Sequence, residues 1–398
     1  MLRSKTNNAT VSKWTLAGLM ACTSMATDIY LPAMPAIERE LGGQAELTIS
    51  GFLFGFALAQ LVWGPISDRI GRRTPLICGM SMFILGSIGC ALSNSMTMVI
   101  MCRIFQAVGA CTGPMLSRSI VRDVYSKEES ARMLSTLMII LAVSPICAPL
   151  LGSFLQAWLS WRAVFVMLAI LASVLLVAVI RMPETNSSGK ATKQSFSNYF
   201  LSYRNLLKNR AFMGYTMTIM LFSVAIYAFV SGSPDMYINH FKIEPWVYSI
   251  LFGINMVGVV AVSALNRNLV GKYSFDKLLK NSSAISFAAA AVMLALSLFG
   301  MIGIVPMVVL VFIICSNNGI MNSCSNAAAL NVIPSENAGA AAALLGSLQY
   351  GSGIISSVLL ALPVQEFHSN MMVLIIFTFT SLSALNAGCQ YKRSLKQG

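Results

Sequence analysis

Twelve long apolar runs divide this sequence, and they constrain its fold more than any other feature. Each run is about as long as the 18 or more apolar residues that a helix needs to cross a bilayer. The sequence therefore predicts an all-α polytopic membrane protein with twelve transmembrane helices. The runs lie at 14–36, 47–66, 75–93, 97–117, 134–157, 163–181, 211–233, 246–266, 281–300, 303–323, 338–362 and 370–389.

The charge pattern supports the same interpretation. Only 10% of the residues are charged and the mean hydropathy is +0.73, whereas a soluble domain carries about 25% charged residues. The net charge of +13 is compatible with nucleic-acid binding. However, most of the 27 Lys and Arg fall at the termini and in alternate loops, as the positive-inside rule predicts when both termini are cytoplasmic. We therefore expect the lipid bilayer, and no nucleic acid, as a partner.

A polar stretch at 183–210 separates two sets of six runs, so we expect bundles at 1–182 and 211–398 joined by a cytoplasmic linker loop. The two halves repeat weakly. "DRIGRR" has a degraded copy in "NLVGKY", which places Gly71 and Gly271 at equivalent positions, and "TDIY" is echoed by "PDMY". Such repeats are typical of transporters that bind substrate between two halves near the middle of the membrane.

Several motifs occur in a fixed order along almost the whole chain. They include "TDIYLPAMP", "GPISDRIGRRTPL", "CRIFQAVGA", "SPICAPLLG", "WRAVF" and "GSPDMYI". With these motifs the sequence resembles the major facilitator superfamily, specifically the bicyclomycin/chloramphenicol-resistance branch of bacterial drug:proton antiporters. The resemblance implies the major facilitator fold, a multi-pass monomer of the bacterial inner membrane, and export of small molecules in exchange for protons.

Asp28 is the one acid of the fourteen that lies well inside a predicted span. A buried charge costs several kcal/mol unless it is paired or neutralised, so an acid there indicates a function. An apolar environment favours a neutral carboxyl group and a nearby cation favours a charged one. We expect Asp28 to carry the coupled proton, with Asp235 at the end of the seventh span as the runner-up. A structural pair with Arg103 that braces two helices is the alternative.

Arg103 is the one base within a span, about two turns inside the fourth. Its spacing from Gln106 places both side chains on one helix face. We expect both to point into the cavity and Arg103 to couple to Asp28. The alternative is an arginine that extends its charged end to the membrane interface.

The loop between the second and third spans combines glycines with clustered charges. Two glycines permit a tight cytoplasmic turn, and an aspartate there can pair with neighbouring arginines. Resemblance to the family implies a latch between the two halves, whereas a basic loop that only sets topology is the alternative. The expected gating residues are Gly64, Asp68, Arg69, Gly71, Arg72 and Arg73.

The fifth span carries Pro145, Pro149 and Gly152. Proline removes backbone hydrogen bonds, and small residues permit close helix packing. Resemblance to the family indicates its antiporter motif, although Ser144 stands where the family usually has glycine. Packing alone is the alternative role.

Other polar and aromatic residues within spans are candidates for the substrate cavity, and the alternative for each polar one is a hydrogen bond between helices. They are Tyr30, Gln106, Tyr227, Asn322, Asn326 and Gln349.

The motifs of other protein classes are missing. The sequence has two His, both in predicted loops, no metal-ligand spacing and no phosphate-binding loop. We therefore expect no enzyme activity, cofactor or metal. The predicted function is proton-coupled efflux of small amphipathic drugs, and export of an endogenous metabolite such as a siderophore is the alternative.

Overall fold

The computed structural model describes residues 12–185, 196–334, 337–362 and 368–397, and this part of the chain is helical with short connections. The first half contains α1 (Lys13–Asp28), η1 (Leu31–Ala33), α2 (Met34–Leu41), α3 (Glu46–Ile70), α4 (Arg73–Ala91), α5 (Met96–Ala110), α6 (Thr112–Val124), α7 (Lys127–Trp158) and α8 (Trp161–Ile180). Helix α9 (Phe196–Lys208) follows. The second half contains α10 (Arg210–Pro234), η2 (Asp235–His240), α11 (Pro245–Leu269), α12 (Phe275–Leu298), α13 (Ile304–Asn331), α14 (Ala338–Leu360) and α15 (His368–Gln397).

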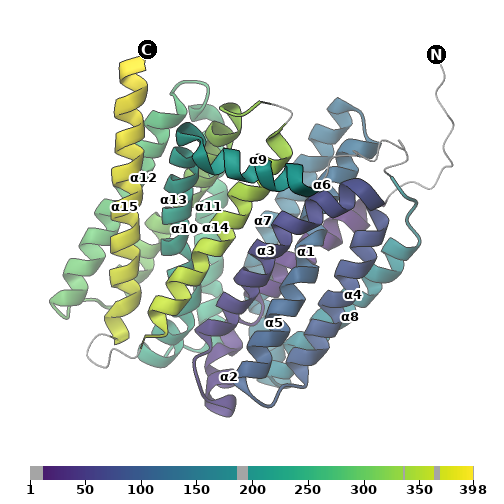
Figure 1. The fold of residues 1–398 in the computed structure, drawn as a ribbon. Coiled ribbons are helices and arrows are strands. Elements are labelled where there is room, and N and C mark those ends of the chain that lie inside the picture. The colour runs from purple at the N-terminus through teal and green to yellow at the C-terminus, as the bar shows by residue number, and fades with distance from the viewer. Residues whose placement is uncertain (1–11, 186–195, 335–336, 363–367, 398) are drawn as a thin grey trace.

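The two halves stand side by side as two helical bundles (Figure 1). They meet along two long helix pairs, α3 with α14 and α7 with α11. The start of α1 and the end of α15 lie at the same end of the bundles (Figure 1), which is the end that the charge pattern predicts to be cytoplasmic. The arrangement confirms the major facilitator fold expected from the sequence.

Eleven helices in the described part of the chain are long and apolar enough to cross a membrane. They correspond to the second to twelfth predicted spans, with α5 continuing into α6 and α10 into η2. The first predicted span, at 14–36, is broken instead of continuous, because α1 ends at Asp28.

Proline explains that break. Pro32 has no N–H and cannot bond to the carbonyl of Asp28 four residues earlier, and its ring would clash with that carbonyl in a continuous helix. Pro35 has the same effect on Leu31. The chain therefore leaves α1 at Ile29, makes the short 3₁₀ turn η1 and restarts as α2.

The predicted linker contains a helix, which the sequence analysis did not anticipate. Helix α9 occupies 196–208 of the stretch expected as a loop at 183–210, while 186–195 lie outside the described residues. Helix α9 packs against α10 and α14 of the second half, and Tyr203 hydrogen-bonds to α3 of the first half.

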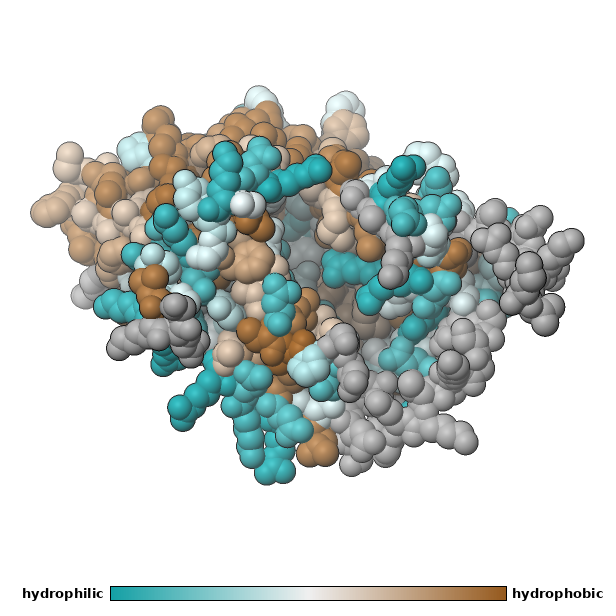
Figure 2. Space-filling model, turned by 90° about the horizontal axis from the view of Figure 1, so that it is seen from above, coloured by the Kyte–Doolittle hydropathy of each residue, from teal (hydrophilic) through white to brown (hydrophobic). Residues whose placement is uncertain are grey.

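The halves are closed together at the end opposite the termini. There α2 packs against η2, and η1 packs against α10 and α11. Gln44 Nε2 donates to the carbonyl of Ala361 across the interface, at 2.5 Å. Figure 2 looks onto the other end and shows a hollow in the middle of that face. The described structure is thus closed at the predicted external end and hollowed at the predicted cytoplasmic end.

Candidate functional site

Asp28 stands at the broken end of α1. It lies about 22 Å along the helix from Lys13 at 1.5 Å per residue, deep in the bundle, and the residue is partly exposed to solvent. Among the charges near it, Arg103 acts on it most directly. Asp28 thus lies at the end of a helix, deep in the bundle, in contact with the protein and partly exposed to water.

Arg103 is fully buried and caps the end of α1. Its Nη1 donates to the carbonyl of Ala26 at 2.9 Å and to Gln106 Oε1 at 2.7 Å. The Ala26 carbonyl is free to accept because the helix ends before Tyr30, and a cation at a helix C-terminus is favoured by the helix dipole.

Aromatic rings enclose the rest of the guanidinium group. Its carbon lies 4.2 Å from the centre of the Tyr30 ring, 4.3 Å from that of Phe52 and 5.9 Å from that of Phe165. Nε and Nη2 have no hydrogen-bond acceptor. Cation–π contacts of a desolvated guanidinium stabilise it by about 2 kcal/mol or more. An aromatic box therefore holds the charge of Arg103 without a carboxylate against it.

The expected coupling partners are close without touching. Asp28 and Arg103, both in the described part of the chain, form no ion pair within 4.0 Å. Arg103 acts on Asp28 through space and through the carbonyl of Ala26, two residues before it.

Two residues expected at the cavity lie elsewhere. Tyr30 is fully buried, with its hydroxyl 3.2 Å from Thr48 Oγ1 and its ring against Arg103. Gln106 is also fully buried and donates to Ser87 Oγ at 2.7 Å. The i,i+3 spacing did bring Arg103 and Gln106 together, but their shared face turns toward neighbouring helices and not toward the hollow.

Three other expected cavity residues form one polar cluster between α13 and α14. Asn326 Nδ2 donates to Asn322 Oδ1 at 2.7 Å, and Gln349 Nε2 donates to the same oxygen at 3.5 Å. All three side chains keep solvent access. The second half thus presents an uncharged group of amides, which can donate and accept hydrogen bonds to a ligand.

Tyr227 lies with a tyrosine that the sequence analysis missed. Its ring centre is 6.5 Å from that of Tyr350 on α14, and the Tyr350 ring centre lies 4.4 Å from that of Phe56 on α3, with the two rings tilted by 43°. Asp28 lies close enough to act electrostatically on both tyrosines. Tyr350 follows Gln349 directly in the sequence, and this adjacency was the available signal. These two tyrosines, on α10 and α14, therefore place aromatic rings of the second half near Asp28.

Helix α7 runs unbroken through Pro145 and Pro149. A side chain at Gly152 would overlap the carbonyl of Ile29, so α7 packs directly on the break that follows Asp28. Ser249 Oγ of α11 donates to the carbonyl of Pro149 at 2.9 Å. The predicted antiporter helix therefore touches both the end of α1 and the second half.

The loop between α3 and α4 is bound within the first half. Arg72 pairs with Asp68 at 2.7 Å and with Asp123 of α6 at 3.0 Å. The carboxylate of Glu184 accepts from the backbone N–H groups of Arg72 and Arg73 and caps α4.

The glycines of this loop differ in role. Gly71 makes the turn with a φ of 93°, in the region that favours glycine. Gly64 lies inside α3, because that helix continues to Ile70, so its expected place in the turn is wrong. Arg69 lies in the last turn of α3. The latch between halves that the family resemblance implied stays a prediction.

Asp235, the runner-up proton carrier, lies in η2 at the predicted external end. It accepts from Asn239 Nδ2 at 2.8 Å and lines a cavity of about 30 Å³ together with Glu46 and His240. It is therefore placed at the closed mouth, whereas Asp28 is placed in the interior.

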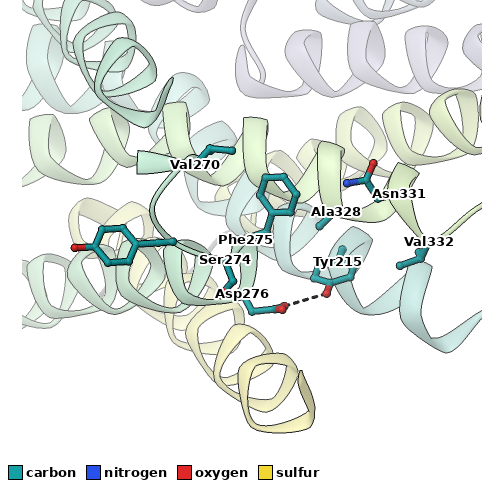
Figure 3. Close-up of a pocket in the computed structure, with 9 residues that line it drawn as sticks. Tyr215, Val270, Ser274, Phe275, Asp276, Ala328, Asn331 and Val332 are labelled. Carbon is teal, nitrogen blue, oxygen red and sulfur yellow. Dashed lines mark hydrogen bonds between the residues drawn. The ribbon is translucent and has the colours of Figure 1, made fainter. Parts of the chain in front are cut away.

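A separate cavity of about 320 Å³ lies at the predicted cytoplasmic end of the second half (Figure 3). Tyr215 donates to Asp276 Oδ1 at 2.9 Å on its wall. This cavity lies among α10, α11, α12 and α13, away from the interface between the halves. Its lining residues are Tyr215, Val270, Tyr273, Ser274, Phe275, Asp276, Ala328, Asn331 and Val332.

Comparison with known proteins identifies the family. Residues 16–357 match the Major Facilitator Superfamily. The chain is 32% identical to the MFS-type transporter YdgK of Bacillus subtilis, covering 91% of each chain. It is 28% identical to multidrug resistance protein D of Escherichia coli over 87% of each, and 26% identical to a bicyclomycin resistance protein homolog of Haemophilus influenzae over 87% of this chain and 88% of the relative.

Solved structures of low sequence identity share the fold. A bacterial homolog of the human lysosomal transporter Spinster, in an inward-facing conformation, is similar with a TM-score of 0.72 at 15% identity over 96% of each chain. The xylose transporter XylE of E. coli is similar with a TM-score of 0.74 at 14% identity, over 94% of this chain and 95% of that one. The chain therefore belongs to the major facilitator superfamily, in its bicyclomycin/chloramphenicol-resistance branch of membrane transporters.

Proposed function

We propose that this transporter exports small amphipathic drugs across the bacterial inner membrane in exchange for protons, with Asp28 as the proton carrier. One observation carries the proposal: the carboxyl group of Asp28 stands at a helix break deep in the bundle, in a residue that is partly exposed, and it lies near a buried cation without pairing to it. Both termini lie in the cytoplasm in this proposal, so the hollow in Figure 2 admits cargo from inside the cell.

Coupling requires that proton and cargo disfavour each other's binding. Asp28 can exchange a proton with water in the hollow, and Arg103 supplies a fixed positive charge nearby. The tyrosine pair Tyr227–Tyr350 and the amide cluster on α13 and α14 offer aromatic and hydrogen-bonding surface for a ligand near that carboxyl group. Cargo bound there excludes water from Asp28, which changes the cost of its charge.

The relatives named for bicyclomycin and multidrug resistance favour drugs as cargo. An aromatic and amide surface of mixed character suits amphipathic molecules of varied shape. An endogenous metabolite, such as a siderophore, carried by the same mechanism is the alternative cargo, and the amide cluster suits its polar groups equally well.

The test uses protein in proteoliposomes with an imposed pH gradient and a panel of phenicols, bicyclomycin and cationic dyes. Asp28→Asn should abolish uphill transport driven by the gradient, because the carboxyl group that exchanges protons is gone. Uphill transport that survives in Asp28→Asn would contradict the proton-carrier role.

The matched control is Asp276→Asn, since Asp276 is also partly exposed but lies on the cavity of the second half. It should retain gradient-driven transport. Wild-type protein that moves none of the drugs, yet expels a siderophore-like compound in the same gradient, would favour the alternative cargo.

A further inference from the structure

Helix α9 lies across α14 and α3 on the surface of the molecule, near the predicted cytoplasmic ends of both helices and at a steep angle to them (Figure 1). It packs against α14 and α10. Because α3 and α14 pair across the two halves, α9 spans one of the seams between them.

A hydrogen bond fixes α9 to α3 at a proline. Tyr203 donates its hydroxyl hydrogen to the carbonyl of Leu61 at 3.2 Å. That carbonyl lacks its usual helical partner, because residue 65 is a proline with no N–H. Tyr203, which is 7% exposed, therefore completes the backbone bonding of α3 from outside.

The bond also sets the depth of α9. Leu61 lies nine residues before the end of α3 at Ile70, or about 14 Å along its axis. Helix α3 has 25 residues, and is about 37 Å long, against about 30 Å for the hydrocarbon core. A helix attached at Leu61 therefore lies beside α3 and not beyond its cytoplasmic end, where its side chains can reach the upper acyl chains.

The described side chains of α9 fall into separate sectors around its axis. Tyr203 and Leu206 face the protein and are buried. Phe200 and Leu207 are seven residues apart, so they share the next sector, and they are 63% and 49% exposed. Arg204 and Lys208 share a further sector at i,i+4 and are exposed.

The charge of this surface is all of one sign. Arg210 at the start of α10 adds a third exposed base, and the stretch 196–210 contains no acid. A helix with an apolar stripe beside a basic stripe lies in the plane of a membrane interface. Bases next to anionic lipid contribute to binding through the headgroup charge.

We propose that α9 is a binding surface for anionic phospholipid of the cytoplasmic leaflet. Phe200 and Leu207 lie among the upper acyl carbons, and Arg204, Lys208 and Arg210 bind headgroup phosphates. Lipid bound there holds α9 across the seam between α3 and α14. The proposal stands apart from the proton-carrier role of Asp28.

Hydrogen–deuterium exchange tests it without any transport assay. The full-length protein is placed in nanodiscs of phosphatidylcholine, alone or mixed with phosphatidylglycerol, and exchange is followed in peptides covering 196–208. Anionic lipid should slow exchange of α9 by about tenfold or more, from three bases acting together, and added salt should reduce the effect.

Two variants and one additive sharpen the test. Arg204→Gln with Lys208→Gln and Arg210→Gln should lose the protection by phosphatidylglycerol. The matched control, Lys272→Gln with Lys277→Gln, removes exposed bases from the α11–α12 region and should keep it. Inorganic phosphate added to phosphatidylcholine nanodiscs should give no protection, because a free anion lacks the apolar contact.

Several outcomes would overturn the proposal. Equal exchange of α9 in both lipid compositions would do so, as would protection that persists in the triple variant or disappears in the control. Protection by inorganic phosphate alone would show that α9 binds a free anion and not a lipid. Phe200→Ser with Leu207→Ser should speed α9 exchange in both compositions. Unchanged exchange would show that these two side chains do not contact the acyl chains.

Discussion

At the scale of single residues, Gly152 sets how closely α7 approaches the end of α1. A Cβ at this position would overlap the carbonyl oxygen of Ile29, which is backbone and cannot rotate away. Gly152→Ala should therefore lower stability by about 1–3 kcal/mol, the usual cost of overpacking, and lower the apparent unfolding temperature in detergent. Transport should fall as well, because Asp28 is next to the displaced segment.

Gly388→Ala is the matched control, since nothing lies within 4 Å of a Cβ placed there. It should leave the unfolding temperature unchanged or slightly higher, because alanine favours a helix over glycine. An unfolding temperature for Gly152→Ala equal to that of the wild type would mean that the contact with Ile29 is not a tight one in the membrane.

Residue identities could be predicted from the sequence better than their surroundings. An acid and a base inside apolar runs stand out because the membrane makes charges costly, so Asp28 and Arg103 were found. Periodicity predicted that Gln106 would share a face with Arg103, but not which helices that face would meet. Its burial results from packing against Ser87 of α4, and that of Tyr30 from packing against α3, α5 and α8, which no local pattern specifies.

At the scale of elements, the bond from Tyr203 to the carbonyl of Leu61 attaches α9 to the bundle. A neutral hydrogen bond contributes about 0.5–1.5 kcal/mol net, so Tyr203→Phe should speed exchange of α9 amides by roughly twofold to twelvefold. The ring remains in place, so overall stability should change little. Hydrogen–deuterium exchange of peptides covering α9 measures the effect.

Tyr273→Phe serves as the control, because Tyr273 is 44% exposed and its ring lies beneath Lys277. It should not alter α9 exchange. If Tyr203→Phe also leaves α9 exchange at the wild-type rate, the hydroxyl does not hold the helix to α3.

Elements were predictable where composition is strongly apolar. Eleven predicted spans became long helices, and the break in the first follows from Pro32 opposite the carbonyl of Asp28. Helix α9 was missed because its 13 residues are amphipathic within a polar stretch. Its stability depends on contacts with α3 and α14 from opposite halves, and these are not local in the sequence.

At the scale of the whole molecule, the weak internal repeat predicts two related bundles, yet it does not show how they meet. The closed external end depends on pairs far apart in the chain, such as Gln44 with Ala361. The residues 363–367 next to this contact lie outside the described part. The end at which the two halves open depends on the relative stability of such contacts at the external and cytoplasmic ends. Sequence patterns do not report this difference in stability.

Gln44 gives a direct way to shift this balance. Gln44→Ala removes the side chain that donates to the carbonyl of Ala361, at a cost to the closed external end of about 1 kcal/mol. The ratio of externally open to externally closed molecules should then rise about fivefold. Distances between spin labels placed on α2 and on the external end of α14 would report the two populations. Gln156→Ala is the control, because Gln156 Oε1 has no hydrogen-bond partner, and it should leave the distances unchanged. A distance distribution for Gln44→Ala that matches the wild type would show that other contacts, such as η1 against α10 and α11, close this end without it.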